Sequence, residues 1–127
     1  MENAELYKAL IKFQGMASAM PKTTAAFKFK YVELHTIWDA IREPLQKCGL
    51  GVIQTNVSSQ GGRVGVRTIL VHESGQSIED SCYSIDGAVP NGVSAIQKQG
   101  MDITYLRRYG LSSILGLTTE PDKDGNS

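Results

Sequence analysis

The spacing of apolar residues changes twice along this chain, and these changes limit the folds that the chain can adopt. Before Gly49, apolar residues recur every three or four positions, which is typical of amphipathic helices. From Leu50 to Ile85 apolar and polar residues alternate, which is typical of half-buried strands. The helical period returns at about Val93. A chain with this order of elements is predicted to be an α+β protein.

Two helices are predicted before Gly49. The first begins at Asn3 and ends before Pro21, because proline cannot continue a helix. The second begins at Tyr31, and Gly49 offers its C-terminal cap. Pro44 lies inside this second pattern and predicts a kink or a boundary nearby.

Three strands and a long helix are predicted after Gly49. The strands are Leu50–Val57, Val64–His72 and Gln76–Ile85, and the loops between them are short and rich in serine and glycine. Short loops favour an antiparallel meander. The last helix extends from Val93 to Leu115 and is closed by Gly116. The predicted fold is therefore two N-terminal helices, a three-stranded antiparallel meander and a long C-terminal helix.

The chain is long enough for one domain with its own core. It has 127 residues, of which 41% are hydrophobic and 20% charged, as in ordinary globular proteins. We assign residues 1–118 to this domain. Residues 119–127 are polar and acidic, and we expect this tail to be disordered.

Composition excludes several classes of protein. Two cysteines without a zinc-ligand spacing do not make a disulfide scaffold, so we expect a reducing, cytoplasmic setting. No apolar run reaches the length of a membrane span, and the first residues do not resemble a signal peptide. Because the formal net charge is zero, a polycation that coats duplex DNA is not expected.

No enzyme motif is present in the sequence. It contains neither a nucleophile elbow nor a phosphate-binding loop nor a metal-spaced histidine pair, so we predict no catalytic residue, no metal and no cofactor. We assign structural or surface roles to His35, His72, Cys48 and Cys82. The glycines at 61, 62 and 110 are interpreted as turn and packing residues.

The last predicted helix carries the residues most suggestive of a binding site. A helical projection places its apolar residues on one broad arc and sets Lys98, Tyr105 and Tyr109 together on the opposite side. The two tyrosines, four positions apart, are suited either to stacking on bases or to a subunit or packing contact.

Two adjacent arginines on the same helix are predicted to differ in their surroundings. Arg107 falls inside the apolar arc, so we expect it to be buried, either in an ion pair with Glu33 or Asp39 or in contact with a phosphate. Arg108 lies at the border of the arc, where we expect it to contact nucleic acid.

Two further groups of cations are predicted to extend this surface. The segment Lys22 to Tyr31 interleaves Lys28 and Lys30 with aromatic residues, which suits a single strand whose phosphates need charge and whose bases need π-faces. A solvated loop with its aromatics folded inward is the alternative. Arg63 and Arg67, placed on the second strand, are predicted to share one face, as part of a basic track or as solvated charges.

Two segments together resemble a known family. The block from Phe27 to Leu34 and the motif Thr104-Tyr105-Leu106-Arg107-Arg108-Tyr109-Gly110-Leu111 are similar to segments of the Erf (essential recombination function) family of phage single-strand annealing proteins. The segment Arg67 to Gly75 resembles the strand and turn that the family has between them, and the similarity spans about Ala9 to Asn126. Asp102 departs from the family pattern and puts a negative charge near the tyrosines.

The resemblance implies a β-β-β-α core and a protein that binds single-stranded DNA and anneals complementary strands as an oligomeric ring or helical filament, without nucleotide hydrolysis. The implied partners are single-stranded DNA, further copies of the chain, and a phage exonuclease or a host single-strand-binding protein, in the cytoplasm of a bacterial host. The alternative is an oligomeric structural or adaptor protein with no direct DNA contact. The residues predicted to contact DNA are Lys28, Lys30, Arg67, Lys98, Tyr105, Arg107, Arg108 and Tyr109.

Overall fold

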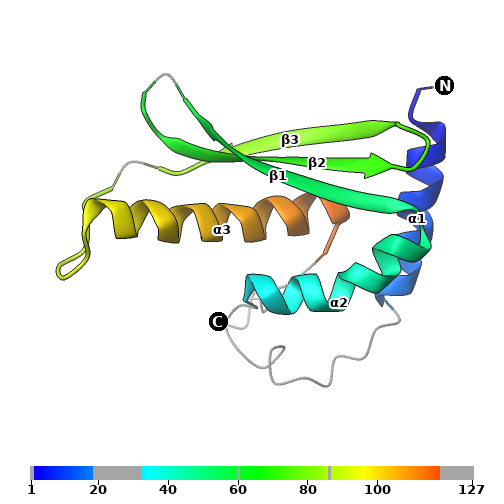
Figure 1. Ribbon diagram of the computed structural model, residues 1–127, viewed down its shortest axis with the longest axis horizontal. Helices are drawn as coiled ribbons and strands as arrows, with labels where there is room; N and C mark the ends of the chain where they lie inside the picture. Colours follow the sequence, from blue (N-terminus) through cyan, green and yellow to red (C-terminus); the bar gives the residue numbers. More distant parts are fainter. Residues whose placement is uncertain (1, 19–32, 60, 86, 118–127) are drawn as a thin grey trace, which may run out of the picture.

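The computed structural model describes residues 2–18, 33–59, 61–85 and 87–117. These residues form three helices and three strands, drawn in Figure 1. In chain order the elements are α1 (Ala4–Ser18), α2 (Leu34–Lys47), β1 (Leu50–Ser58), β2 (Val64–His72), β3 (Ser77–Tyr83) and α3 (Ala95–Leu115). The predicted α+β order is confirmed. The predicted tail, residues 119–127, lies outside the described residues.

The three strands form one antiparallel sheet in the order β1-β2-β3. The register pairs Leu50 with His72 and Ser58 with Val64, so β1 and β2 are matched along their whole length. On the other side of β2, Gly65 pairs with Tyr83. The predicted meander is confirmed.

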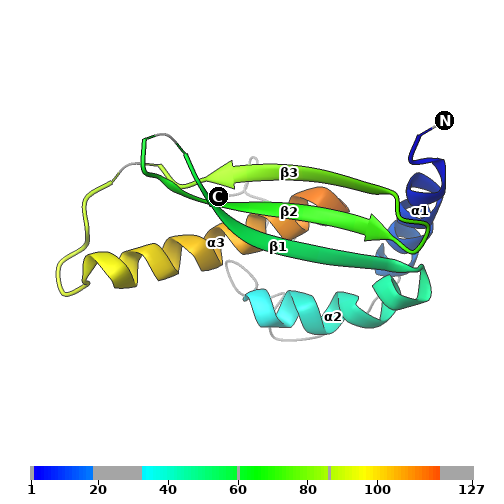
Figure 2. The ribbon, with the colours of Figure 1, turned by 45° about the horizontal axis from the view of Figure 1, so that its top comes forward.

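Helix α3 lies along one face of the sheet, mainly beneath β2 (Figures 1 and 2). Val66, Thr68 and Leu70 alternate along β2 on this face and are all buried. No helix among the described residues covers the opposite face, where Ile53 and Tyr83 are nearly half exposed.

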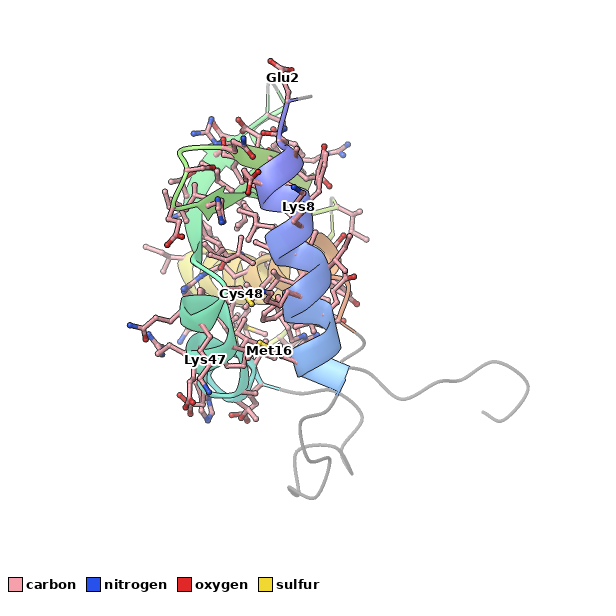
Figure 3. All side chains as sticks on the ribbon, turned by 90° about the vertical axis from the view of Figure 1, so that its right-hand side faces the viewer. Glu2, Lys8, Met16, Lys47 and Cys48 are labelled. Atoms are coloured by element: carbon pink, nitrogen blue, oxygen red, sulfur yellow. The ribbon has the colours of Figure 1, made fainter. Side chains whose placement is uncertain are left out.

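The hydrophobic core lies at the end of the sheet where the three helices meet. Helix α1 stands across this end, and the backbone N–H of Leu6 donates a 2.9 Å hydrogen bond to the Gln76 side chain. Figure 3, viewed from the side of α1, labels Met16 and Cys48, whose sulfur atoms lie 3.6 Å apart. The fully buried members of the core include Leu6, Phe13, Ile41, Leu70, Leu111 and Leu115.

Helices α2 and α3 end close to the glycines predicted to cap them. Helix α2 passes through Pro44 and ends one turn later at Lys47, so the boundary predicted near this proline is confirmed. Gly49 and Gly116 follow α2 and α3 with φ angles of 70° and 73°, a left-handed conformation that glycine adopts without strain. The first residues predicted for the second helix, Tyr31 and Val32, lie outside the described residues.

The N-terminus of α3 depends on a capping box, because its first turns extend past the end of the sheet (Figures 1 and 2). The Ser94 hydroxyl accepts a hydrogen bond from the backbone N–H of Gln97, and the Gln97 side chain accepts one from the backbone N–H of Ser94. Ile96 and Met101, in the same turns, are 77% and 58% exposed. Capping therefore replaces tertiary packing as the local source of stability here.

Replacing Ser94 by alanine is expected to loosen these first turns. Loss of such a cap costs about 1 kcal/mol, which raises the population of the opened form about five-fold. Amide hydrogen exchange at residues 97–100 should become faster by this factor, while exchange in the core stays unchanged. Ser113→Ala, an exposed site on the same helix, is the matched control. Equal exchange rates in Ser94→Ala and the parent would contradict the assigned role of the cap.

Candidate nucleic-acid interface

The structure does not bring all the predicted DNA-contacting residues together. Lys28 and Lys30 lie outside the described residues. Arg67 lies on β2, and the other five lie on α3. The sheet separates Arg67 from the residues of α3.

Arg67 lies on the face of the sheet that points away from α3. Its neighbours Val66 and Thr68 face α3, and successive side chains of a strand point to opposite faces. The Nε atom of Arg67 is 3.3 Å from a carboxylate oxygen of Glu79 on β3. Arg63 lies one residue before the start of β2, and its sharing a face with Arg67 stays a prediction. Arg67 is therefore not part of one surface with the residues of α3.

Lys98 is held by an ion pair within α3. Its Nζ atom is 2.7 Å from Asp102, one turn further along, and the two side chains are only 23% and 28% exposed. Asp102 therefore competes with any phosphate for this ammonium group.

The predicted surroundings of the two adjacent arginines are reversed in the structure. Arg108, expected at the border of the apolar arc, is buried with 6% of its surface exposed, whereas Arg107 is only partly buried. Arg108 shares a face with Leu111 and Leu115, at positions i, i+3 and i+7, and both leucines are fully buried. The buried face at the end of α3 thus keeps the predicted Leu111 and Leu115 but includes Arg108 in place of Arg107.

The ion pairs predicted for Arg107 are also absent from the part of the chain that the structure describes. Neither Glu33 nor Asp39 pairs with its guanidinium. The backbone carbonyl of Arg107 instead accepts a 3.0 Å hydrogen bond from the Gln54 side chain.

Two tyrosine side chains and the Arg108 guanidinium form a cluster on α3. The rings of Tyr105 and Tyr109, hereafter the tyrosine pair, have centroids 4.8 Å apart and are tilted by 59°. The Tyr109 hydroxyl donates to the Tyr105 hydroxyl at 3.2 Å. The Arg108 guanidinium carbon lies 4.4 Å from the centroid of Tyr105 and 5.6 Å from that of Tyr109, within cation–π range of both.

Both members of the tyrosine pair are partly exposed to solvent. Tyr105 and Tyr109 are 45% and 42% exposed, although the cation beside them is buried. Exposed π-faces next to positive charge suit the stacking of unpaired bases. The prediction that the two tyrosines lie side by side on the helix is confirmed.

A close contact between α3 and the sheet fixes the position of this cluster. Gly110 lies against Thr68, and a β-carbon at position 110 would overlap the Thr68 hydroxyl oxygen. Gln54 Nε2 donates to that same oxygen and to the Arg107 carbonyl, both at 3.0 Å. The backbone turn that carries the tyrosine pair is thereby held against β1 and β2. Gly110 is confirmed as a packing glycine, whereas no pattern in the sequence points to Gln54.

Cys82 is a further contact between α3 and the sheet. Its thiol donates a weak 3.6 Å hydrogen bond to the Leu106 carbonyl. Burial raises the pKa of the Cys82 thiol above its ordinary value, and the negative charge of Asp80 raises it further.

The raised pKa of Cys82 makes stability depend on pH. The folded protein favours the neutral thiol, so this contribution is complete below the unfolded pKa of about 8.5 and is lost as the pH rises through the folded pKa. We expect the free energy of unfolding, measured in urea, to fall more between pH 8 and pH 10.5 for the parent than for Cys82→Ser. Parallel pH profiles for the two proteins would contradict the assignment.

The described residues contain no group of three or more histidine, cysteine or acidic side chains that could hold a metal ion. Within the same residues, no helix has the length and apolar character that crossing a membrane requires.

Comparison with known proteins identifies the family but provides no individual relative. A search of curated proteins and a search of solved structures each find no match. The family model of the ERF superfamily matches residues 6–127, which is nearly the whole chain and includes all of the fold except the first two residues of α1. The chain therefore belongs to the ERF superfamily.

Proposed function

We propose that this protein binds single-stranded DNA and anneals complementary strands as an oligomer, without nucleotide hydrolysis. The family match over residues 6–127 carries the proposal, because ERF proteins act in phage recombination and strand annealing. The geometry supports it through the tyrosine pair, which offers two exposed rings beside a buried cation. Stacking and charge are the interactions that hold a single strand without reading its sequence.

The charge inventory supports binding by many subunits together. Of the nine lysines and arginines in the described residues, Lys8, Lys47, Arg67 and Lys98 are in ion pairs with carboxylates. The described part of one chain therefore offers few cations to phosphates, and each contact adds only about 0.7 to the slope of log affinity against log salt. Useful affinity then requires subunits arranged along one strand.

Exposed apolar side chains at two ends of the molecule support self-association. Ile96 and Met101 lie on the first turns of α3, beside a shallow depression of about 620 Å³, and Tyr7 and Ile11 lie on the outer side of α1. Different patches at opposite ends favour head-to-tail contacts, which close into rings or continue as filaments. A phage exonuclease or a host single-strand-binding protein is the proposed further partner.

Titration of a fluorescent oligonucleotide tests DNA binding. Fluorescence anisotropy at 50 mM and 200 mM salt should show binding to a single strand that weakens steeply with salt and depends little on sequence. Binding to the matched duplex should be weaker. Absence of single-strand binding at 50 mM salt, from a protein that sediments as an oligomer, would instead support the structural or adaptor function.

A further inference from the structure

We propose that Arg108 is a positioning residue that holds the tyrosine pair ready for base stacking and does not itself contact a phosphate. This inference rests on the proposed DNA-binding function and assigns a role within the same site. It replaces the direct DNA contact that the sequence predicted for Arg108.

The burial of Arg108 argues against a phosphate contact. Only 6% of its surface is exposed, and it lies on the helix face that carries the fully buried Leu111 and Leu115. A phosphate group of single-stranded DNA remains in solvent, so a guanidinium that binds it must reach the surface. The partly exposed Arg107 is better placed for that role.

The same guanidinium is close to both rings. Its carbon atom lies 4.4 Å from the centroid of Tyr105 and 5.6 Å from that of Tyr109, so one cation attracts both side chains. The 3.2 Å hydrogen bond between the two hydroxyls links the outer ends of the rings. Each ring is therefore held at two points, while more than 40% of each tyrosine stays exposed.

Ordering the rings in advance strengthens binding without adding a contact to DNA. A free tyrosine on a helix surface loses rotamer freedom when a base stacks on it, and this loss weakens binding. Because Arg108 already fixes the rings in the folded protein, this rotamer freedom is lost on folding and not on DNA binding. Removing Arg108 should therefore weaken DNA binding but leave the number of neutralised phosphates unchanged.

The test measures affinity and its salt dependence in Arg108→Met, which keeps a long side chain in the buried position but removes the cation. We expect the affinity for a single-stranded oligonucleotide to fall about ten-fold, with the same slope of log affinity against log salt as the parent. Arg108→Lys restores a cation without the planar group and should recover part of the loss. It also serves as the test variant if thermal denaturation shows that Arg108→Met does not fold.

A double-mutant cycle separates positioning from a general loss of structure. In a Tyr105→Leu/Tyr109→Leu background, the Arg108 substitution should cause no further loss of affinity, because the rings through which it acts are gone. Arg42→Met removes a comparable cation from the ring of Trp38 on α2 and is the matched control. We expect its affinity to stay within two-fold of the parent.

Three outcomes would overturn the proposal. The first is a slope of log affinity against log salt that falls by about 0.7 in the Arg108 variants, because this indicates a lost phosphate contact. The others are an equal loss of affinity in Arg42→Met, and a loss of affinity on Arg108 substitution that is as large in the Tyr105→Leu/Tyr109→Leu background as in the parent. Failure of the parent protein itself to bind single strands would instead overturn the proposed function.

Discussion

Valine in place of Gly110 is expected to lower the free energy of unfolding by about 2 to 3 kcal/mol, the cost of overpacking a close contact. Any β-carbon at this position overlaps the Thr68 hydroxyl oxygen, which a 3.0 Å hydrogen bond from Gln54 holds in place. Thr68 lies on the central strand and is 1% exposed, so it cannot move aside. Urea denaturation followed by circular dichroism measures the change.

Gly110→Ala allows a sharper version of this test. Its effect on the free energy of unfolding should be negative when residue 68 is threonine and positive when residue 68 is alanine. In the parent, Gly110→Ala should destabilise the protein. In a Thr68→Ala background the overlapping oxygen is gone, and the next atoms lie at an ordinary 3.5 Å from the added β-carbon. There, the better helix propensity of alanine should stabilise the protein by up to about 1 kcal/mol.

Thr68→Val is the control for this pair of variants, because it keeps a branch at the overlapping position and should not rescue Gly110→Ala. A Gly110→Ala protein as stable as the parent would show that α3 does not lie as close to β2 as the structure has it.

Removing both rings of the tyrosine pair is expected to weaken the binding of single-stranded DNA by at least about 30-fold. Base stacking on an aromatic side chain contributes about 1 to 3 kcal/mol per base, so the loss of two rings costs at least about 2 kcal/mol. Because both tyrosines are more than 40% exposed, Tyr105→Ala/Tyr109→Ala should still fold. Anisotropy titration against an oligonucleotide without secondary structure gives the affinity.

The matched control is Tyr105→Phe/Tyr109→Phe, which keeps the rings and loses only the 3.2 Å hydrogen bond between the hydroxyls. We expect its affinity to stay within about three-fold of the parent. If the alanine variant binds as tightly as the parent, the rings do not stack on bases. A change in its assembly mass alone would then assign the pair to a subunit contact, the alternative that the sequence left open.

The sequence predicted the elements of the fold because each carries a clear apolar period and a clear end. The change of period at Gly49, with its φ of 70°, separates α2 from β1, and the left-handed Gly116 ends α3. These signals are local, so they do not depend on how the elements pack.

The prediction failed for Arg107 and Arg108 because burial depends on the neighbours of a helix. The projection included Ile96, which proved to be 77% exposed on turns that extend past the sheet. Leaving such residues out shifts the buried face toward Leu111 and Leu115, and this face includes Arg108. Ile96 thus fits the apolar period of the helix, but it is not buried in the fold.

Alternation in a strand likewise predicts which residues share a face but not which face the helix covers. The sequence predicts that Arg67 shares a surface with the residues of α3, whereas α3 lies on the other face with Val66 and Thr68. The role of Gln54 cannot be predicted from strand alternation either. It depends on the hydrogen bond from the Gln54 side chain to the backbone carbonyl of Arg107, which only the packing of α3 on the sheet creates.

Annealing of two complementary oligonucleotides, one carrying a fluorophore and the other a quencher, tests the proposed function most directly. With neither ATP nor divalent metal present, the protein at a concentration that saturates single-strand binding should accelerate annealing well above the spontaneous rate. The Tyr105→Ala/Tyr109→Ala variant should lose this acceleration, and the phenylalanine pair should keep it. An annealing rate equal to that without protein, measured while both strands are bound, would contradict the account.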